Sequence, residues 1–188
     1  NEHRKISGFC TGKTLSYKVV DMFVSDKVNN QDSESQRSYK ASLPECVLGY
    51  LKPIDWGWMS SKYGKRTDPF SGKPAWHDGI DFAAKLDQLV YASDSGVILS
   101  TSFDQGYGNR VEILHGNGDI TTYSHLNSFL VGVGESVVKG QPIAKLGSTG
   151  KSTGPHVGFG LKRNGKFIDP QSYMVDIEKC RPKYLELN

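Results

Sequence analysis

Four side chains suited to metal binding or proton transfer stand in short segments that are rich in glycine. The first segment is His77-Asp78-Gly79-Ile80-Asp81, in which an imidazole and a carboxylate lie four residues apart. Both groups are good ligands for Zn²⁺, and an even spacing along an extended chain directs both side chains to one face. This pair alone is a weak signal, because a histidine and an aspartate at such a spacing occur by chance in many chains.

Two further histidines stand where strands are expected to end or begin. His125 follows Thr122-Tyr123-Ser124, and His156 follows a Gly154-Pro155 turn. Backbone geometry at such a position can hold an imidazole toward a cleft, as a general base or an oxyanion stabiliser requires. A hydrogen-bonded structural role is the better interpretation of either histidine alone. Their occurrence together, in order after the first segment, favours a functional site.

Short β-strands are the elements that would position these side chains. Between Trp56 and Tyr173 the sequence alternates between β-branched or aromatic runs and turns that contain glycine. This pattern is typical of a mainly β, mostly antiparallel fold without amphipathic helices. The clearest hairpin signal is Asn117-Gly118, which apolar strand residues flank on both sides. The expected strands are 89–92, 96–101, 110–115, 120–125, 141–146 and 156–161.

Composition and patterning divide the chain into three parts. With 188 residues, of which 37% are hydrophobic and 23% charged, the chain is long enough to bury a core. Alternation of Leu15, Tyr17 and Val19 predicts a strand, and the polar stretch 25–42 predicts a long loop. The predicted parts are an N-terminal accessory segment at 1–51, the main β domain at 52–175 and a charged C-terminal tail at 176–188.

The charge balance argues against several classes of partner. The net charge is +3, with 23 basic and 20 acidic residues and no long block of either sign. Such a balance suits an anionic cell-wall polymer only weakly, and we expect no nucleic acid partner. Gly150-Lys151-Ser152 is similar to the end of a phosphate-binding loop, but Lys145 stands where that motif requires glycine. Nucleotide binding is therefore not expected.

Cysteine usage and the absence of long apolar runs bear on the compartment. No run approaches the roughly 20 apolar residues of a membrane-spanning helix, and we expect no span in this sequence. Because it begins without Met or a signal peptide, we expect a mature or trimmed form. Cys10, Cys46 and Cys180 show no CxxC spacing. Two interpretations of the three cysteines stay open. They form one disulfide and leave one free thiol, or all three are buried thiols.

The ordered series of segments resembles the lysostaphin-type (LytM-like) zinc metallopeptidases. The resemblance covers about residues 63–173 and implies an antiparallel β-sheet core of that peptidase domain, with zinc as cofactor. The matching segments are Trp76-His77-Asp78-Gly79-Ile80-Asp81-Phe82-Ala83-Ala84, Val90-Tyr91-Ala92, Asp94-Ser95-Gly96-Val97, Gly106-Tyr107-Gly108-Asn109, Thr122-Tyr123-Ser124-His125-Leu126, Val138-Lys139-Gly140-Gln141-Pro142-Ile143-Ala144, Gly147-Ser148-Thr149-Gly150-Lys151-Ser152-Thr153-Gly154-Pro155-His156, Gly165 and Asp169-Pro170.

The resemblance implies a role for each matching site residue. In this family an HxxxD motif and the second histidine of an HxH motif hold the zinc, so His77 and Asp81 are the implied ligands. The third ligand position falls on Gly158, which has no donor atom. Two protein ligands then remain where a catalytic zinc site normally has three and a water. Losing the hydrogen-bond partner of a metal ligand typically lowers metal affinity or activity by roughly 10- to 100-fold. We expect the loss of a ligand itself to cost at least as much.

The implied catalytic pair is His125 with His156, which in the family orients the attacking water and stabilises the tetrahedral intermediate. Three further residues of the matching segments, Tyr107, Asn109 and Tyr123, are expected to contact the substrate.

No other histidine is expected to replace the missing ligand. His115 ends a strand that carries a histidine in many relatives, where it is not a ligand, and His3 lies in the unmatched N-terminal segment. Many relatives place glutamate at the position of Gly160, two residues beyond Gly158 and on the same face of the strand. We therefore expect the floor of the cleft to be opened at both glycines.

Three functional hypotheses follow from the resemblance. The first is a peptidoglycan-directed domain of impaired catalysis, acting as a cell-wall-binding or hydrolase-regulating scaffold protein. The second is an active zinc endopeptidase that cleaves peptide cross-links of peptidoglycan. The third is a structural docking module in an envelope or secretion assembly. The implied partners are peptidoglycan or its peptides and a cell-wall hydrolase or envelope assembly, and the implied location is periplasmic or extracellular.

Overall fold

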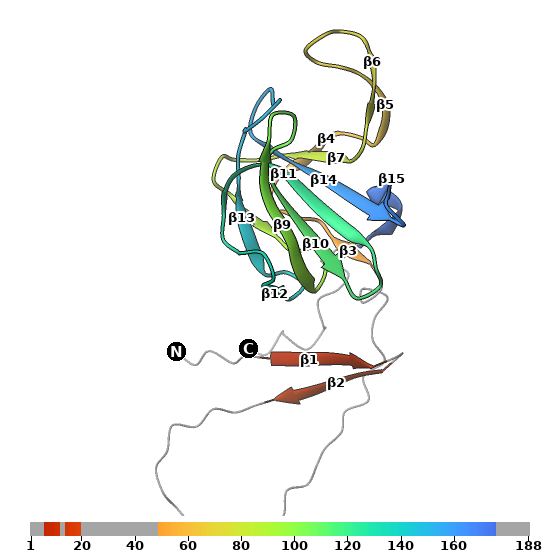
Figure 1. Cartoon of the computed structure of the whole chain (residues 1–188), viewed down its shortest axis with the longest axis vertical. Coiled ribbons are helices and arrows are strands. Elements are labelled where there is room, and N and C mark those ends of the chain that lie inside the picture. Colours follow the sequence, from red (N-terminus) through yellow and green to blue (C-terminus); the bar gives the residue numbers. More distant parts are fainter. Residues whose placement is uncertain (1–5, 12–13, 20–48, 176–188) are drawn as a thin grey trace, which may run out of the picture. The chain divides into compact units, whose positions relative to one another are not determined.

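The computed structural model describes residues 6–11, 14–19 and 49–175 (Figure 1). The chain divides into two compact units, Asn1–Val47 and Leu48–Asn188. The described residues of the first unit form an antiparallel hairpin of β1 (Ile6–Thr11) and β2 (Thr14–Val19). β2 confirms the strand predicted near the N-terminus. The predicted polar loop, the predicted charged tail, Cys46 and Cys180 lie outside the described residues.

The second unit is built from short strands joined by turns. In chain order they are β3 (Tyr50–Leu51), β4 (Trp58–Ser61), β5 (Gly64–Thr67), β6 (Pro74–His77), β7 (Ile80–Ala83), β8 (Leu89–Tyr91), β9 (Gly96–Asp104), β10 (Gly108–His115), β11 (Ile120–Phe129), β12 (Ser136–Val137), β13 (Pro142–Leu146), β14 (His156–Arg163), β15 (Lys166–Ile168) and β16 (Met174–Val175). A short 3-10 helix, η2 (Pro170–Tyr173), precedes β16. All six strands predicted in this region are confirmed, as is the mainly β fold. None of the described residues belongs to a helix long and apolar enough to cross a membrane.

Antiparallel pairing places the site strands in the middle of one large sheet. The order of its main path is β12-β9-β10-β11-β14-β7-β4, and β15 extends it beside β14. The turn between β10 and β11 is the hairpin predicted from Asn117-Gly118, and Gly118 has a φ of +85° there. A left-handed backbone of this kind is open to glycine without steric cost.

Strand β11 changes partners at His125. Its pairing with β14 ends at Ser124, opposite Gly158, and its pairing with β13 begins at Leu126, opposite Leu146. His125 lies between the two ladders with a φ of 63°, which is uncommon for a residue with a side chain. Its backbone N–H donates to the carbonyl of Tyr107 at 2.7 Å. This bend gives the imidazole a direction that regular strand alternation would not provide.

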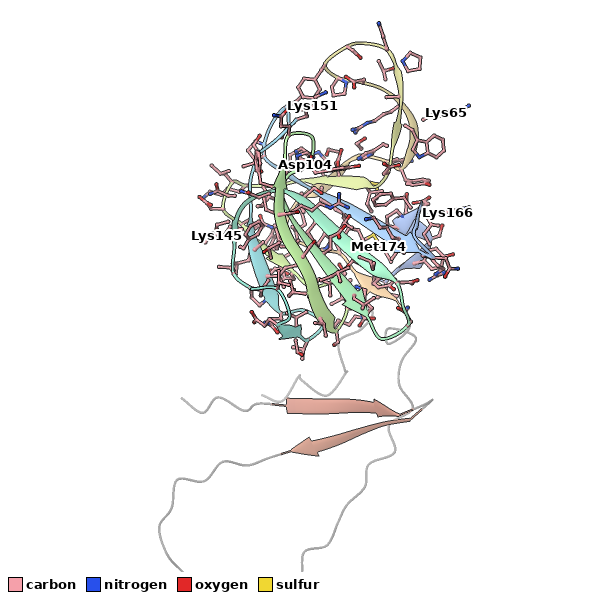
Figure 2. The ribbon with its side chains drawn as sticks, in the orientation of Figure 1. Lys65, Asp104, Lys145, Lys151, Lys166 and Met174 are labelled. Carbon is pink, nitrogen blue, oxygen red and sulfur yellow. The ribbon has the colours of Figure 1, made fainter. Side chains whose placement is uncertain are left out.

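The hairpin of β5 and β6 projects from the large sheet (Figure 2). Asp68 orders the turn between its strands, because its carboxylate accepts hydrogen bonds from the N–H groups of Phe70 and Ser71 at 2.7 and 2.9 Å. Lys65 marks this hairpin in Figure 2, while Asp104 and Lys151 mark two loops on the other side of the sheet's upper end. The hairpin and these loops form two walls above the sheet.

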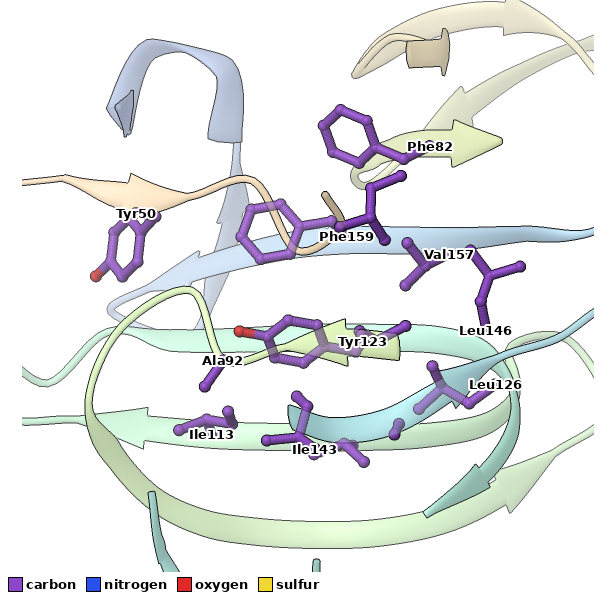
Figure 3. Packing of buried hydrophobic residues seen from close by; sticks show 14 of the residues in the cluster. Tyr50, Phe82, Ala92, Ile113, Tyr123, Leu126, Ile143, Leu146, Val157 and Phe159 are labelled. Atoms are coloured by element: carbon purple, nitrogen blue, oxygen red, sulfur yellow. The ribbon is translucent and has the colours of Figure 1, made fainter. Parts of the chain in front are cut away.

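The core lies between the main sheet and the ribbon of β8 and β13. Side chains from β10, β11 and β14 point toward those of β13 in Figure 3, and the Tyr123 and Phe159 rings lie 5.5 Å apart. Both rings are fully buried. Burial of an aromatic side chain contributes roughly 1.5–3 kcal/mol each, so this core holds the site strands together. The fully buried aliphatic side chains include Ile80, Val90, Val111, Ile113, Leu126, Ile143, Leu146, Val157 and Leu161.

A buried polar cluster on β10 and β11 holds His115. Its Nδ1 donates to the carbonyl of Ser95 at 2.9 Å, and its Nε2 lies 2.7 Å from the hydroxyl of Thr121. The Tyr50 ring packs beside the imidazole at 5.3 Å. Burial is the main cause that lowers the pKa of His115, and it outweighs the Ser95 bond and nearby carboxylates that raise it. His115 is therefore held as a neutral structural residue.

We expect the free energy of unfolding to fall as the pH is lowered below about 6.5, the ordinary pKa of histidine. The folded pKa of His115 is lowered, so the unfolded chain binds more protons in this range and stability is complete only above it. Urea unfolding at a series of pH values measures the slope. In His115→Gln the slope should be smaller but not zero, because burial lowers the pKa of His125 in the same direction. Equal slopes in the two proteins would contradict this account.

Candidate functional site

A groove of about 210 Å³ opens on the face of the sheet away from the core. Strands β7, β11 and β14 form its floor. One wall is the β5–β6 hairpin, with Phe70 and Trp76, and the other is formed by Tyr107 and Lys151. His77, Asp81, His125 and Gly158 all line this groove. The fold thus brings together residues from four strands and two walls.

Asp81 is the charged centre of the floor, with 7% of its surface exposed. Its Oδ2 accepts a hydrogen bond from Arg66 Nη1 at 3.0 Å, and the same nitrogen donates to Ser61 Oγ at 2.7 Å. Its Oδ1 lies 3.2 Å from His77 Nε2 and 3.9 Å from His156 Nε2. Every one of these partners reaches the same carboxylate, so Asp81 connects the hairpin wall to the floor.

Two opposing influences set the pKa of Asp81. Burial alone would raise it, but the hydrogen bond and charge of His77, the charge of His156 and the bond from Arg66 outweigh burial. The pKa of Asp81 is therefore below its ordinary value of 3.8. The carboxylate is ionised at neutral pH and offers lone pairs to a cation or a hydrogen-bond donor.

Backbone carbonyls fix the three groove histidines in one tautomer. A carbonyl oxygen can only accept, so the Nδ1 that faces it carries the hydrogen. The three Nδ1···O distances are 2.8 Å, from His77 to Lys62, from His125 to Thr149 and from His156 to Gly154. In the neutral form each Nε2 then carries a lone pair. His77 Nε2 faces Asp81 Oδ1 at 3.2 Å, so the two atoms can share one proton or one cation.

His125 and His156 lie side by side, with ring centroids 4.5 Å apart. The pKa of His125 is lowered, mainly by burial, which outweighs the raising effect of the hydrogen bond to Thr149. His125 is therefore neutral at pH 7 and can accept a proton or a hydrogen bond through Nε2. Two imidazoles beside a carboxylate have the chemistry of a general base and its neighbour.

Gly158, to which the family resemblance assigns the third ligand position, has no side chain to add to this set of donors. Gly158 pairs with Asp81 on one side and Ser124 on the other, and it presents only backbone to the groove. Among the residues that the structure describes, no group of three or more His, Cys, Asp or Glu is arranged to hold a metal ion. His115 lies in the buried cluster with Tyr50 and so cannot supply the missing donor, and His3 lies outside the described ranges.

The three residues expected to contact substrate differ in their surroundings. Tyr107 lines the groove, and its hydroxyl lies 3.3 Å from Asp78 Oδ2. Asn109 instead donates to the carbonyls of Leu126 and Asn127 and holds β10 against β11. Tyr123 is fully buried, and its hydroxyl accepts a hydrogen bond from Ser93 N at 2.8 Å. The Tyr123 ring belongs to the core and does not line the groove, and the substrate contacts expected of these three residues stay predictions.

Sequence reasoning missed Arg66, the closest cation to Asp81, as well as Phe70, Trp76 and Lys151 in the walls. A single arginine has no spacing that would reveal its partner. Trp76 stands beside His77 in the matching segment and is 56% exposed. An aromatic next to a ligand motif could have drawn attention to this wall.

The sequence profile of Peptidase family M23 matches residues 75–170. Peptidoglycan DD-endopeptidase ShyC of Vibrio cholerae is 38% identical over 148 residues, which is 78% of this chain and 33% of that protein. DD-carboxypeptidase/endopeptidase Mpg of Neisseria meningitidis is 40% identical over 122 residues, 65% of this chain and 28% of that protein. The chain thus spans about a third of the length of these curated relatives.

Solved structures give the same result for the fold. The catalytic domain of lysostaphin from Staphylococcus simulans is 31% identical with a TM-score of 0.57, covering 62% of this chain and 91% of that one. A zinc-containing peptidase from Vibrio cholerae is 29% identical with a TM-score of 0.61, covering 84% of this chain and 49% of that one. Together with the profile match and the groove, these likenesses show that the chain belongs to Peptidase family M23.

Proposed function

We propose that this chain binds peptidoglycan peptides in its groove and has impaired metal-dependent catalysis, acting as a cell-wall-binding or hydrolase-regulating protein. The observation that carries the proposal is Gly158 in the third ligand position, facing a groove that is otherwise intact. The names of relatives such as ShyC support peptidoglycan as the ligand class. A location in the periplasm or outside the cell follows from that ligand.

The residues of the groove do not fit a catalytic zinc ion, although M23 is a zinc metallopeptidase family. His77 and Asp81 supply two donors, and their 3.2 Å separation suits two ligands of one ion. Ligands at zinc distances in tetrahedral geometry lie about 3.4 Å apart. His156 Nε2 is too distant from Asp81 Oδ1, at 3.9 Å, to complete that geometry. The groove residues therefore do not form a complete catalytic zinc site.

An active zinc endopeptidase is the second candidate. The retained His77–Asp81 pair and the paired imidazoles of His125 and His156 favour it. It requires an additional donor at the empty position beside Gly158. A docking module in an envelope assembly, the third hypothesis, has no comparable support in the groove.

Space around the two floor glycines decides whether a side chain can be restored. A Cβ on Gly158 would lie 3.4 Å from Asp81 Oδ1 and from His125 Cδ2, which is ordinary contact. A Cβ on Gly160 would lie 2.5 Å from Thr122 Oγ1 and 2.8 Å from the Phe167 ring. The expectation of an opened floor is therefore wrong at Gly160, where Phe167 fills the space, while Gly158 borders a true opening.

We expect Gly158→His to raise the affinity for zinc by at least about 10- to 100-fold over the unmodified chain, because it restores a third donor. Competition with a chromophoric chelator measures this affinity, and release of cell-wall peptides measures activity. Gly158→Ala is the matched control and should bind zinc no better than the unmodified chain. If the unmodified chain already held one tightly bound zinc and cleaved cell-wall peptides, the proposal of impaired catalysis would be wrong.

The two glycines should also differ in their tolerance of alanine. Gly160→Ala forces Thr122 and the Phe167 ring apart and should destabilise the domain by about 1–3 kcal/mol. Gly158→Ala should change stability by less than about 1 kcal/mol, since its methyl group meets only ordinary contacts. Urea unfolding of both variants checks this difference. Equal destabilisation would mean that the opening beside Gly158 is not available to a side chain.

A further inference from the structure

The groove floor presents hydrogen-bond acceptors that converge without a donor between them. Asp81 Oδ1 and His156 Nε2 lie 3.9 Å apart, and the His125 ring lies 4.5 Å from that of His156. His125 is only 9% exposed, and its Nε2 has no hydrogen-bond partner among the described residues. Because His125 lines the groove, this nitrogen is open to a hydrogen-bond donor that enters there.

The separation of the acceptors distinguishes between two kinds of positively charged ligand. Two ligands of a zinc ion lie about 3.4 Å apart, because the bonds are short. Acceptors around an ammonium nitrogen, with hydrogen bonds of about 2.9 Å, lie up to about 4.7 Å apart. The observed 3.9 Å between Asp81 Oδ1 and His156 Nε2 exceeds the zinc value and falls within the ammonium range.

We infer that the floor beside Gly158 binds the primary ammonium group of a peptide ligand, held by Asp81, His125 and His156. This inference rests on the proposed function, since it names the part of the peptide that the groove recognises. Gly158 makes room for it, because the place of its missing Cβ is 3.4 Å from both Asp81 Oδ1 and His125 Cδ2. The floor carries no side chain at this position, so the ligand can approach over the backbone of Gly158.

The remaining charges of the site are compatible with an ammonium ligand. Arg66 occupies Oδ2 of Asp81 and leaves Oδ1 directed toward the imidazoles. The other cation of the lining is Lys151, and Asp68 and Asp78 on the opposite wall offset it. The charged side chains that line the groove therefore carry no net positive charge that would repel an amine.

The aromatic wall suits the apolar stem of such a ligand. Phe70 and Trp76 are 57% and 56% exposed and both line the groove. Exposed aromatic faces attract cations and cover alkyl chains. A side chain with several methylenes and a terminal amine matches this combination of an aromatic wall and an acceptor floor.

Two forms of one ligand test the inference on the unmodified, full 188-residue chain. The first is a soluble cell-wall stem peptide with a free lysine ε-amino group, and the second is the same peptide acetylated at that amine. Calorimetry at pH 8 keeps the lysine amine charged, and a chelator keeps metal absent. We expect the free amine to bind at least about tenfold more tightly, because a charged hydrogen bond contributes roughly 1.5–3 kcal/mol.

Variants locate the binding position without relying on any single mutant. Gly158→Ala fills the opening with a methyl group and should reduce the tenfold preference to less than about threefold. Gly132→Ala is the matched control, since nothing lies within 4 Å of its Cβ position and Gly132 does not line the groove. Asp81→Asn should also remove the preference, with circular dichroism showing that the variant is folded.

The outcomes separate this inference from the proposed function. If both peptides bind equally, the ammonium site is wrong while the peptide-binding groove is supported. If neither peptide binds, both proposals are overturned. The same titration without chelator is the comparison. If the free-amine peptide bound only in the absence of chelator, a bound metal would be responsible and the ammonium site would also be overturned.

Discussion

The carboxylate of Asp81 is the group around which the rest of the site is arranged. It is almost fully buried in the sheet floor, where a charge without partners would be strongly destabilising. Arg66 and His77 reach it from the projecting hairpin, and His156 approaches it from β14. The need to compensate one buried charge therefore fixes a groove wall to the floor and gives the groove its shape.

Strand β11 serves both the core and the groove because its backbone turns at His125. Tyr123 and His125 are two residues apart, so regular alternation would direct both side chains to one face. The left-handed conformation at His125 changes this, and Tyr123 fills the core while His125 lines the groove. Bonds from His125 to the carbonyls of Tyr107 and Thr149 hold that conformation. Such local strain is typical of residues with a functional task.

The sequence predicted those parts of the molecule that depend on local pattern. Strands with alternating apolar residues were found. His77, Asp81 and His125 do line one groove, and His156 lies beside it, 3.9 Å from Asp81 Oδ1. The β5–β6 hairpin was missed because its strands have few β-branched residues and little buried surface. Arg66 and the filled space at Gly160 depend on contacts between distant segments. Such contacts follow from the assembled sheet and leave no periodic signal in the chain.

In the function proposed for this chain, glycine at position 158 changes what the groove recognises without changing how it is built. The imidazoles are oriented by backbone carbonyls, so their positions do not require a metal ion. A groove that holds Zn²⁺ presents positive charge and attracts a carbonyl oxygen. The same groove without a third ligand presents the carboxylate of Asp81 and the Nε2 atom of His125, which attract hydrogen-bond donors. Under the proposed function, a glycine in place of a donor side chain inverts the polarity of the site, while the ladders around Asp81 and Ser124 hold the floor in register.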